Sequence, residues 1–202
     1  NVPIHPSQGN FSNSLADGLA WYFKQKQKPF VFRAINRLDR DTTGALILAK
    51  NPYSAAVLSA QMKERHIHRE YLAVVQGLAP ERGTIDAPIG RHPTDRKRMA
   101  VVPGGRRAVT HWKVIARYPG YTHVRCRLET GRTHQIRVHM AYLGHPILGD
   151  TVYGAKKAVP GLPGQCLHAV GLQFIHPRTK ELVSLTCPLP EEFTAMLRKI
   201  DR

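Results

Sequence analysis

Cysteine is scarce in this chain of 202 residues, which has only three, Cys126, Cys166 and Cys187. They are well separated and form no CxxC pair, so the sequence indicates neither a disulfide framework nor a zinc ribbon. No apolar run approaches the roughly 20 residues that cross a bilayer, and residues 1–20 lack the charged region and apolar stretch of a secretory signal. We therefore expect a globular protein of the reducing cytoplasm.

Acidic residues are also few. The chain has 14 Asp and Glu against 30 Lys and Arg, which leaves a net charge of +16 at pH 7. Such a charge attracts phosphate polymers or anionic membranes, and nucleic acid is the expected partner, with a merely solvated surface as the alternative. The uneven spread of the charge argues against that alternative. One stretch with several prolines and glycines predicts a basic loop or hairpin, and it holds Arg91, Arg96, Lys97, Arg98, Arg106 and Arg107.

The hydrophobic content of 42% is enough for one sizeable core, and we expect a single domain over residues 1–202. Apolar periodicity and capping residues predict helices over residues 12–26, 52–65, 134–144 and 190–200. Short runs rich in β-formers predict strands over residues 30–35, 44–50, 69–77, 83–90, 98–103, 108–118, 121–130, 166–177 and 181–188. This order predicts an α+β protein with a central mixed, mostly antiparallel sheet flanked by a few helices.

An acid lies among basic residues in "INRLDRDTTGALILAK", residues 35–50. Asp39 falls in a loop that is predicted to join two buried strands, and Arg37 and Arg40 are its near neighbours. Their positive charge would keep the carboxylate ionised, which suits a nucleophile or an electrostatic stabiliser. The alternative is a surface ion pair, which contributes little.

The segment "ETGRTHQIRVH", residues 129–139, places Arg132, His134, Arg137 and His139 near the start of a predicted helix. We expect Thr133 to cap this helix and Gly144 to end it. Helix N-termini favour anions. Arg137 lies at the edge of the apolar stripe, where an arginine usually has a partner, and a carboxylate such as Asp39 could bind it through a two-pronged contact. A phosphate-binding or purely structural arginine is the alternative.

Several motifs are missing. Histidines 66, 68, 134 and 139 have no thiolate or carboxylate beside them at ligand spacing, so no metal site is predicted. The glycine patterns GxGxxG and GxxxxGK[ST] are absent, as is the GxSxG elbow of serine hydrolases. We therefore expect no cofactor and no metal. A phosphate-binding hydrolase would need a metal cluster or an activated nucleophile that the sequence does not offer.

Four segments, in order, carry a family resemblance. "NRLDRDTTGALILAKN" resembles the signature HRLDxxTSGxxxxAK of the RluA-type pseudouridine synthases, and "REYLAVVQG" resembles their second motif. "ETGRTHQIRVHMAYLGHPILGDTVYG" is similar to the third motif and "CLHAVGLQFIHP" to the closing block. "IGRHPTDRKRMAVVPGGRRAVTHW" is similar to members that act on ribosomal RNA. The resemblance covers nearly the whole chain and implies an RNA-modifying isomerase that converts uridine to pseudouridine without a cofactor.

The resemblance also implies roles for individual residues. Asp39 would be the catalytic aspartate, which attacks the ribose or the uracil or helps to form a glycal, and Arg137 would pair with it. Tyr71 would pack against the target base and could take the proton from carbon 5. Leu167 would form the apolar wall of the pocket, and Arg37 would help to displace or replace the flipped nucleotide.

An enzyme of this kind must extrude a stacked uridine and grip the flanking phosphates, which accounts for the positive charge. Further RNA contacts are expected from Asn36, Arg132, His134, Arg96, Lys97 and Arg98. The sequence departs from the family pattern at Asn36, where histidine is usual, and at Thr43, where serine is common, and both keep a hydrogen-bonding side chain.

The family's "KPAG" strand and the upstream S4 RNA-binding domain of many relatives are not in this sequence, so we expect a catalytic fragment. We also expect a monomer. The rival interpretations are a non-catalytic RNA-binding module and a synthase that is specific for transfer RNA.

Overall fold

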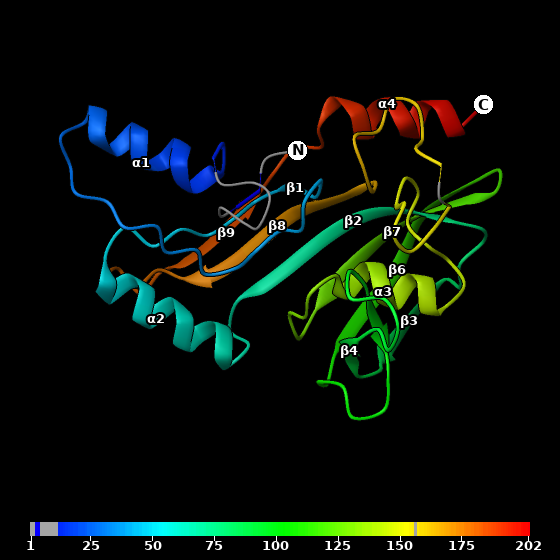
Figure 1. Cartoon of the computed structure of the whole chain (residues 1–202), viewed down its shortest axis with the longest axis horizontal. Coiled ribbons are helices and arrows are strands. Elements are labelled where there is room, and N and C mark those ends of the chain that lie inside the picture. The colour runs from blue at the N-terminus through cyan, green and yellow to red at the C-terminus, as the bar shows by residue number, and fades with distance from the viewer. Residues whose placement is uncertain (1–2, 5–11, 156) are drawn as a thin grey trace.

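A mixed sheet forms the centre of the protein in a computed structural model that describes residues 3–4, 12–155 and 157–202 (Figure 1). In this part of the chain the sheet has seven strands in the order β1-β8-β2-β7-β6-β3, and β9 pairs with β8. Only β1 and β8 run parallel; the other neighbours are antiparallel. The strands are β1 (Thr43–Gly44), β2 (His68–Gln76), β3 (Arg82–Asp86), β6 (Val109–Tyr118), β7 (Tyr121–Leu128), β8 (Leu167–Ile175) and β9 (Leu182–Thr186). The α+β prediction is therefore confirmed.

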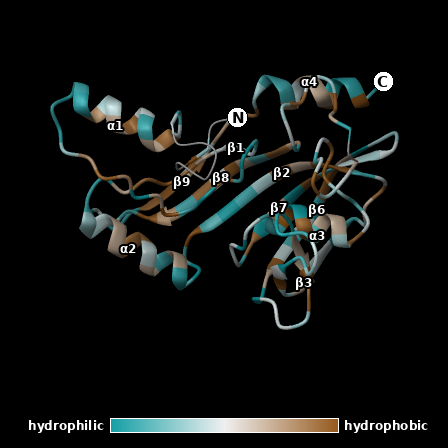
Figure 2. Ribbon diagram, in the orientation of Figure 1, coloured by the Kyte–Doolittle hydropathy of each residue, from teal (hydrophilic) through white to brown (hydrophobic). Residues whose placement is uncertain are grey.

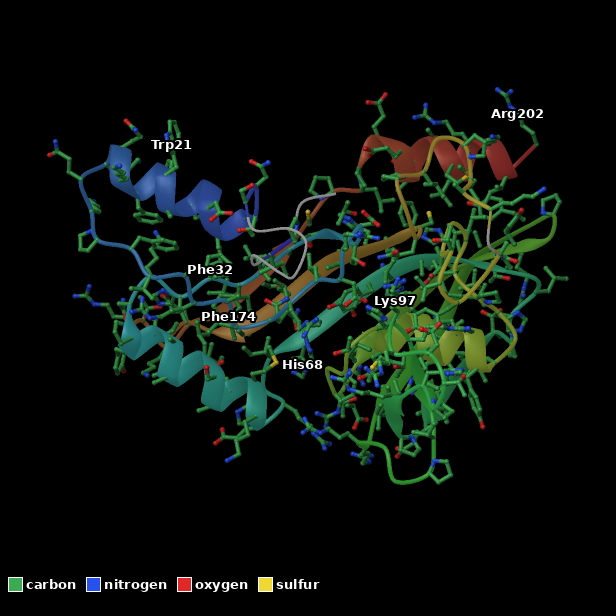
Figure 3. The ribbon with its side chains drawn as sticks, in the orientation of Figure 1. Trp21, Phe32, His68, Lys97, Phe174 and Arg202 are labelled. Carbon is green, nitrogen blue, oxygen red and sulfur yellow. The ribbon has the colours of Figure 1, made fainter. Side chains whose placement is uncertain are left out.

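The predicted basic hairpin is also present as a separate two-stranded sheet. Strands β4 (Ile89–Arg91) and β5 (Met99–Val101) pair antiparallel, and residues 92–98 form the loop between them. Figure 3 shows Lys97 on this loop.

Four helices surround the sheet in the described part of the chain: α1 (Leu15–Gln25), α2 (Pro52–Lys63), α3 (Gln135–Tyr142) and α4 (Glu191–Ile200). In Figure 1, α1 and α2 lie towards one end of the molecule, α3 and the β4–β5 hairpin towards the other, and β2 runs between them. Figure 2 shows hydrophilic and hydrophobic residues alternating on α1, α2 and α4. Within the described ranges, no helix has the length and apolar character needed to cross a bilayer.

Two predicted strands are much shorter than expected. Residues 30–35 and 44–50 pair with each other only around the bridge Ala34–Leu48, and β1 is two residues long. The Ile47 N–H donates to the side-chain oxygen of Asn36 at 2.8 Å, so a side chain takes a place that a strand partner would fill. The two runs are still mostly buried or half-buried, and Ile47 belongs to a core cluster with Leu58 and Leu172.

The start of α3 also differs from the prediction. Thr133 does not cap this helix; the N-cap residue is His134, whose φ of 56° lies in the left-handed region and whose side chain makes no capping hydrogen bond. The Gln135 side chain holds the preceding loop instead, because its oxygen accepts from Thr130 Oγ1 at 2.8 Å and from the Arg132 N–H at 2.9 Å. Gly144, with φ of 81°, follows the C-cap residue, as predicted.

Residues 135–140 of α3 are buried. His139 shows why: its two ring nitrogens bond to Thr110 Oγ1 at 2.9 Å and to the Ala87 carbonyl oxygen at 3.0 Å. This histidine anchors the helix to the sheet and is a core hydrogen-bonding residue. The anchored helix in turn fixes Arg137, which lies half a turn before it.

Candidate active site

The loop that carries Asp39 is held by contacts from the other end of the chain. The Asp39 carbonyl oxygen accepts from the Thr42 N–H at 3.0 Å, which closes a turn. The Gln165 side-chain amide donates to the Arg40 carbonyl oxygen at 2.6 Å and to Thr42 Oγ1 at 2.9 Å. Thr43 Oγ1 and His168 Nδ1 are 2.8 Å apart. The Asp39 carboxylate is therefore presented by a fixed loop on a rigid sheet.

Gly44 explains how this loop can lie so close to β8. Its φ is 113°, and a Cβ atom at this position would lie 2.3 Å from the Ala169 carbonyl oxygen. Any larger residue would push the loop away from the strand and carry Asp39 with it.

The partner of Asp39 is Arg137, as the sequence predicted, but the geometry is different. Arg137 Nη1 lies 3.6 Å from Asp39 Oδ2, and both side chains are largely buried. The two-pronged contact is made with Asp150: Arg137 Nε donates to Asp150 Oδ2 at 2.7 Å and Nη2 donates to Oδ1 at 3.0 Å. The expectation of a two-pronged contact to Asp39 was wrong. Asp150 fixes the guanidinium, and the remaining nitrogen faces Asp39.

Electrostatics agree with this arrangement. Burial lowers the pKa of Arg137, but Asp150 and Asp39 outweigh this effect and hold it above its usual range. Burial raises the pKa of Asp150, but the hydrogen bonds and charge of Arg137 outweigh this effect and hold it below its usual range. Both groups are therefore charged at neutral pH, and Asp39 lies beside a permanent cation. Its side chain is only 15% exposed, so it is not a surface ion pair.

Tyr153 connects this cluster to the basic hairpin. Its hydroxyl accepts from the Met99 N–H at 2.9 Å and lies 2.7 Å from His134 Nδ1. The guanidinium carbons of Arg98 and Arg137 lie 5.4 and 5.1 Å from the centre of its ring. Burial lowers the pKa of His134, so this imidazole is neutral at pH 7.

A cleft of about 940 Å³ opens beside Asp39. Tyr71 and Leu167 come from the neighbouring strands β2 and β8 and line it, together with His134. Burial raises the pKa of Tyr71, so its phenol is protonated at neutral pH. This state suits packing against a base better than taking a proton from carbon 5.

A second, smaller cleft of about 500 Å³ lies against the β4–β5 hairpin. Arg37 and Arg132 line both clefts, and Arg91 and Arg106 line the second one. The two clefts therefore share a border that is lined by arginines.

The remaining predicted residues fall in two groups. Asn36 lines the Asp39 cleft, and its Nδ2 is buried without a hydrogen-bond partner. The hairpin loop carries Arg96, Lys97 and Arg98, and these three residues line neither cleft. Arg96 and Lys97 are exposed, while Arg98 is half-buried against Tyr153. Contact of the hairpin loop with RNA stays a prediction.

Sequence reasoning missed Asp150, Tyr153 and Arg69. The first two were visible in "GDTVYG", at the end of the third motif, where an acid and an aromatic residue follow a glycine. Arg69 was visible as the basic residue two positions before Tyr71, on the same face of a strand. In the described part of the chain, no three His, Cys, Asp or Glu side chains gather as metal ligands.

The fold and the site together define the class of protein: a mixed sheet carries a cleft lined by several arginines, and a buried acid in this cleft pairs with Arg137. Residues 1–142 match the sequence model of the family described as RNA pseudouridylate synthase. The chain therefore belongs to this family.

Two curated relatives are ribosomal large subunit pseudouridine synthases D. The protein of Haemophilus ducreyi is 39% identical over 212 residues, an alignment with 99% of this chain and 65% of the relative. The protein of Nitrosomonas europaea is 42% identical over 204 residues, with 98% and 59% covered. This chain thus spans about 60–65% of the length of these relatives.

Solved structures agree with the fold. Human RNA pseudouridylate synthase domain containing 4 superimposes with a TM-score of 0.76 at 25% identity, covering 98% of this chain and 86% of that one. Human RNA pseudouridylate synthase domain containing 1 gives a TM-score of 0.73 at 30% identity, with 88% and 74% covered.

Proposed function

We propose that this protein isomerises uridine to pseudouridine in structured RNA and that ribosomal RNA is the substrate. The observation that carries this proposal is the Asp39 carboxylate, held 3.6 Å from a buried guanidinium at the base of a cleft lined by Tyr71 and Leu167. The cleft volume of about 940 Å³ lies at the upper end of the range for small-ligand pockets, about 300–1,000 Å³. The names of the curated relatives support ribosomal RNA.

The reaction balances within one nucleotide. The bond from ribose C1′ to uracil N1 breaks, the base turns, and a bond forms from C1′ to C5. The hydrogen on C5 leaves as a proton and N1 gains a proton. Asp39 is the proposed catalytic carboxylate for breaking the first bond, and the guanidinium of Arg137 holds it in place.

The other residues of the cleft are proposed to bind the RNA. Tyr71 packs its neutral ring against the everted uracil, and Leu167 forms the apolar wall beside it. Arg37 faces both clefts and takes the place of the everted base in the RNA, and Arg132 and His134 line the entrance. An RNA helix loses stacking when a base is extruded, so these contacts must supply binding free energy in compensation.

Release of tritium from RNA that carries 5-tritiated uridine tests the proposal. We expect release with the unmodified protein on ribosomal RNA transcripts, and loss of release with Asp39→Asn. RNA retention without release would support the non-catalytic RNA-binding module instead. Release from transfer RNA alone would replace the proposed substrate while leaving the chemistry in place.

We also propose that residues 1–202 act as one catalytic domain, as a monomer, in the cytoplasm. Sedimentation at concentrations up to those of the assay tests the monomer. A dimer that persists on dilution would contradict it.

A further inference from the structure

Arg69 lines the Asp39 cleft and has few hydrogen-bond partners. It belongs to β2, two residues before Tyr71 on the same face, and lines the cleft. Its residue exposure is 8%. Among the described residues its one hydrogen bond runs from Nη2 to the Thr130 carbonyl oxygen at 3.2 Å, and its Nε is buried without a partner. Among the described residues no carboxylate forms an ion pair with it.

The contrast with Arg137 is direct. Arg137 is buried to a similar degree, at 5% exposure, but Asp150 accepts two hydrogen bonds from it and Asp39 lies beside it. A buried cation without a partner destabilises the folded protein, because it loses its water and gains no compensating charge. Burial accordingly lowers the pKa of Arg69. Such a residue is expected where a negatively charged ligand completes the site.

The fold makes room for the guanidinium. A Cβ atom on Gly131 would lie 2.6 Å from Arg69 Nη1, so the absence of a side chain at Gly131 lets Arg69 occupy its place. Gly131 itself lines both clefts. A second donor lines the same cleft: Asn36 Nδ2, also buried without a partner. Two unsatisfied donors in one cleft predict a ligand with oxygen acceptors.

We propose that Arg69 binds an anionic oxygen of the everted nucleotide. The proposal rests on the proposed function and deepens it. Two sources share this chemistry: a phosphate oxygen next to the target uridine, and a carbonyl oxygen of the uracil, which carries negative charge once its bond to the ribose has broken. Arg69 thus joins the proposed binding residues as a buried cation that has no carboxylate partner among the described residues.

Steady-state tritium release separates the two sources. If Arg69 binds a phosphate, Arg69→Met raises KM about tenfold or more with little change in kcat, because the contact exists before reaction. If Arg69 binds the detached uracil, kcat falls about tenfold or more at nearly unchanged KM, because the charge develops only during the reaction. Arg69→Lys should keep part of the activity in either case.

Gly131→Ala is an independent variant, since its methyl group displaces the end of the Arg69 side chain without removing its charge. We expect the same kinetic parameter to change as in Arg69→Met, by a smaller factor. Arg125→Met is the matched control: it removes one arginine from the neighbouring strand, which is exposed and paired with Glu70 outside the cleft. Its kinetic parameters should change less than about twofold.

A purely structural role gives a different result. If Arg69 serves only to hold Thr130, Arg69→Met lowers the melting temperature and Gly131→Ala leaves KM and kcat unchanged. The proposal requires that Arg69→Met loses activity while its melting temperature stays the same or rises, because an unpaired buried cation has been removed. Kinetic parameters within about twofold of the unmodified protein in both variants would overturn the Arg69 assignment alone. No tritium release by the unmodified protein would overturn the proposed function and this inference together.

Discussion

Asp150→Asn is the sharpest test of how the Asp39 site is held. In the folded protein the Asp150 carboxylate is fully buried and accepts two hydrogen bonds from Arg137, at 2.7 and 3.0 Å. It also accepts the backbone N–H groups of Val152 and Tyr153 at 3.0 and 3.1 Å. The asparagine side chain has almost the same shape as the aspartate side chain but keeps only one of its two oxygens. That oxygen can satisfy the backbone donors or part of Arg137, but its NH₂ group must then face other donors.

The expected loss of unfolding free energy in Asp150→Asn follows from the burial of Asp150 and Arg137. Breaking a buried ion pair by removing one partner typically costs about 3–5 kcal/mol, because the other charge is left uncompensated. Arg137 keeps Asp39 at 3.6 Å, so we expect the lower half of this range, about 3–4 kcal/mol. For a domain of this size that corresponds to a fall in melting temperature of roughly 6–16 °C.

Urea unfolding at pH 7 measures the effect, and Asp86→Asn is the control. Asp86 forms the same type of pair with Arg107 at 2.9 Å, but both side chains are about half exposed. An exposed pair of this kind contributes about 0–1 kcal/mol. Equal losses of unfolding free energy in the two variants would refute the reasoning, because burial would then have no influence on the strength of the pair.

The remaining predictions concern charge. The lowered pKa of Asp150 means that its contribution to stability is complete above its unfolded pKa, about 3.9, and is lost as the pH falls through its folded pKa. The difference in unfolding free energy between the unmodified protein and Asp150→Asn should therefore shrink below about pH 4, and a constant difference down to pH 2 would contradict this. Arg137→Met should abolish tritium release while weakening RNA binding far less, and equal loss of both would count against the pairing with Asp39. Replacing Arg96, Lys97 and Arg98 together by alanine should weaken RNA binding and flatten its salt dependence, with the log-log slope changing by about 0.9 for each lost phosphate contact on a duplex. An unchanged slope would place the hairpin loop outside the RNA interface.

The sequence predicted many of the helices and strands because local sequence patterns indicate them. The hairpin of β8 and β9 and the helix α4 follow from short-range periodicity and charge placement, and these elements are present where expected. The strands over 30–35 and 44–50 were overestimated because apolar composition shows burial but not hydrogen-bond partners. One side chain, Asn36, fills a partner's place there.

The sequence predicted several residues of the site but not the geometry of the contacts between them. A two-pronged contact between Arg137 and Asp39 was expected from the sequence, whereas Asp150 makes this contact. Choosing between them requires the path of the chain after α3, which returns Asp150 to the helix only 13 residues after Arg137. The left-handed conformation of His134 could not be predicted either, because Gln135, a buried glutamine in the helix, holds the loop in place of a threonine cap.

Tyr153 contacts both the β4–β5 hairpin and Arg137, the partner of Asp39. On the hairpin side, the guanidinium of Arg98 lies over the tyrosine ring and the Met99 N–H donates to the tyrosine hydroxyl. On the opposite side, the guanidinium carbon of Arg137 lies 5.1 Å from the centre of the same ring, and Arg137 Nη1 lies 3.6 Å from Asp39 Oδ2. Asp150, which fixes the guanidinium of Arg137, also accepts the backbone N–H of Tyr153, so Tyr153 and Arg137 share one carboxylate. A continuous set of side-chain contacts therefore runs from the hairpin through Tyr153 to Arg137 and on to Asp39.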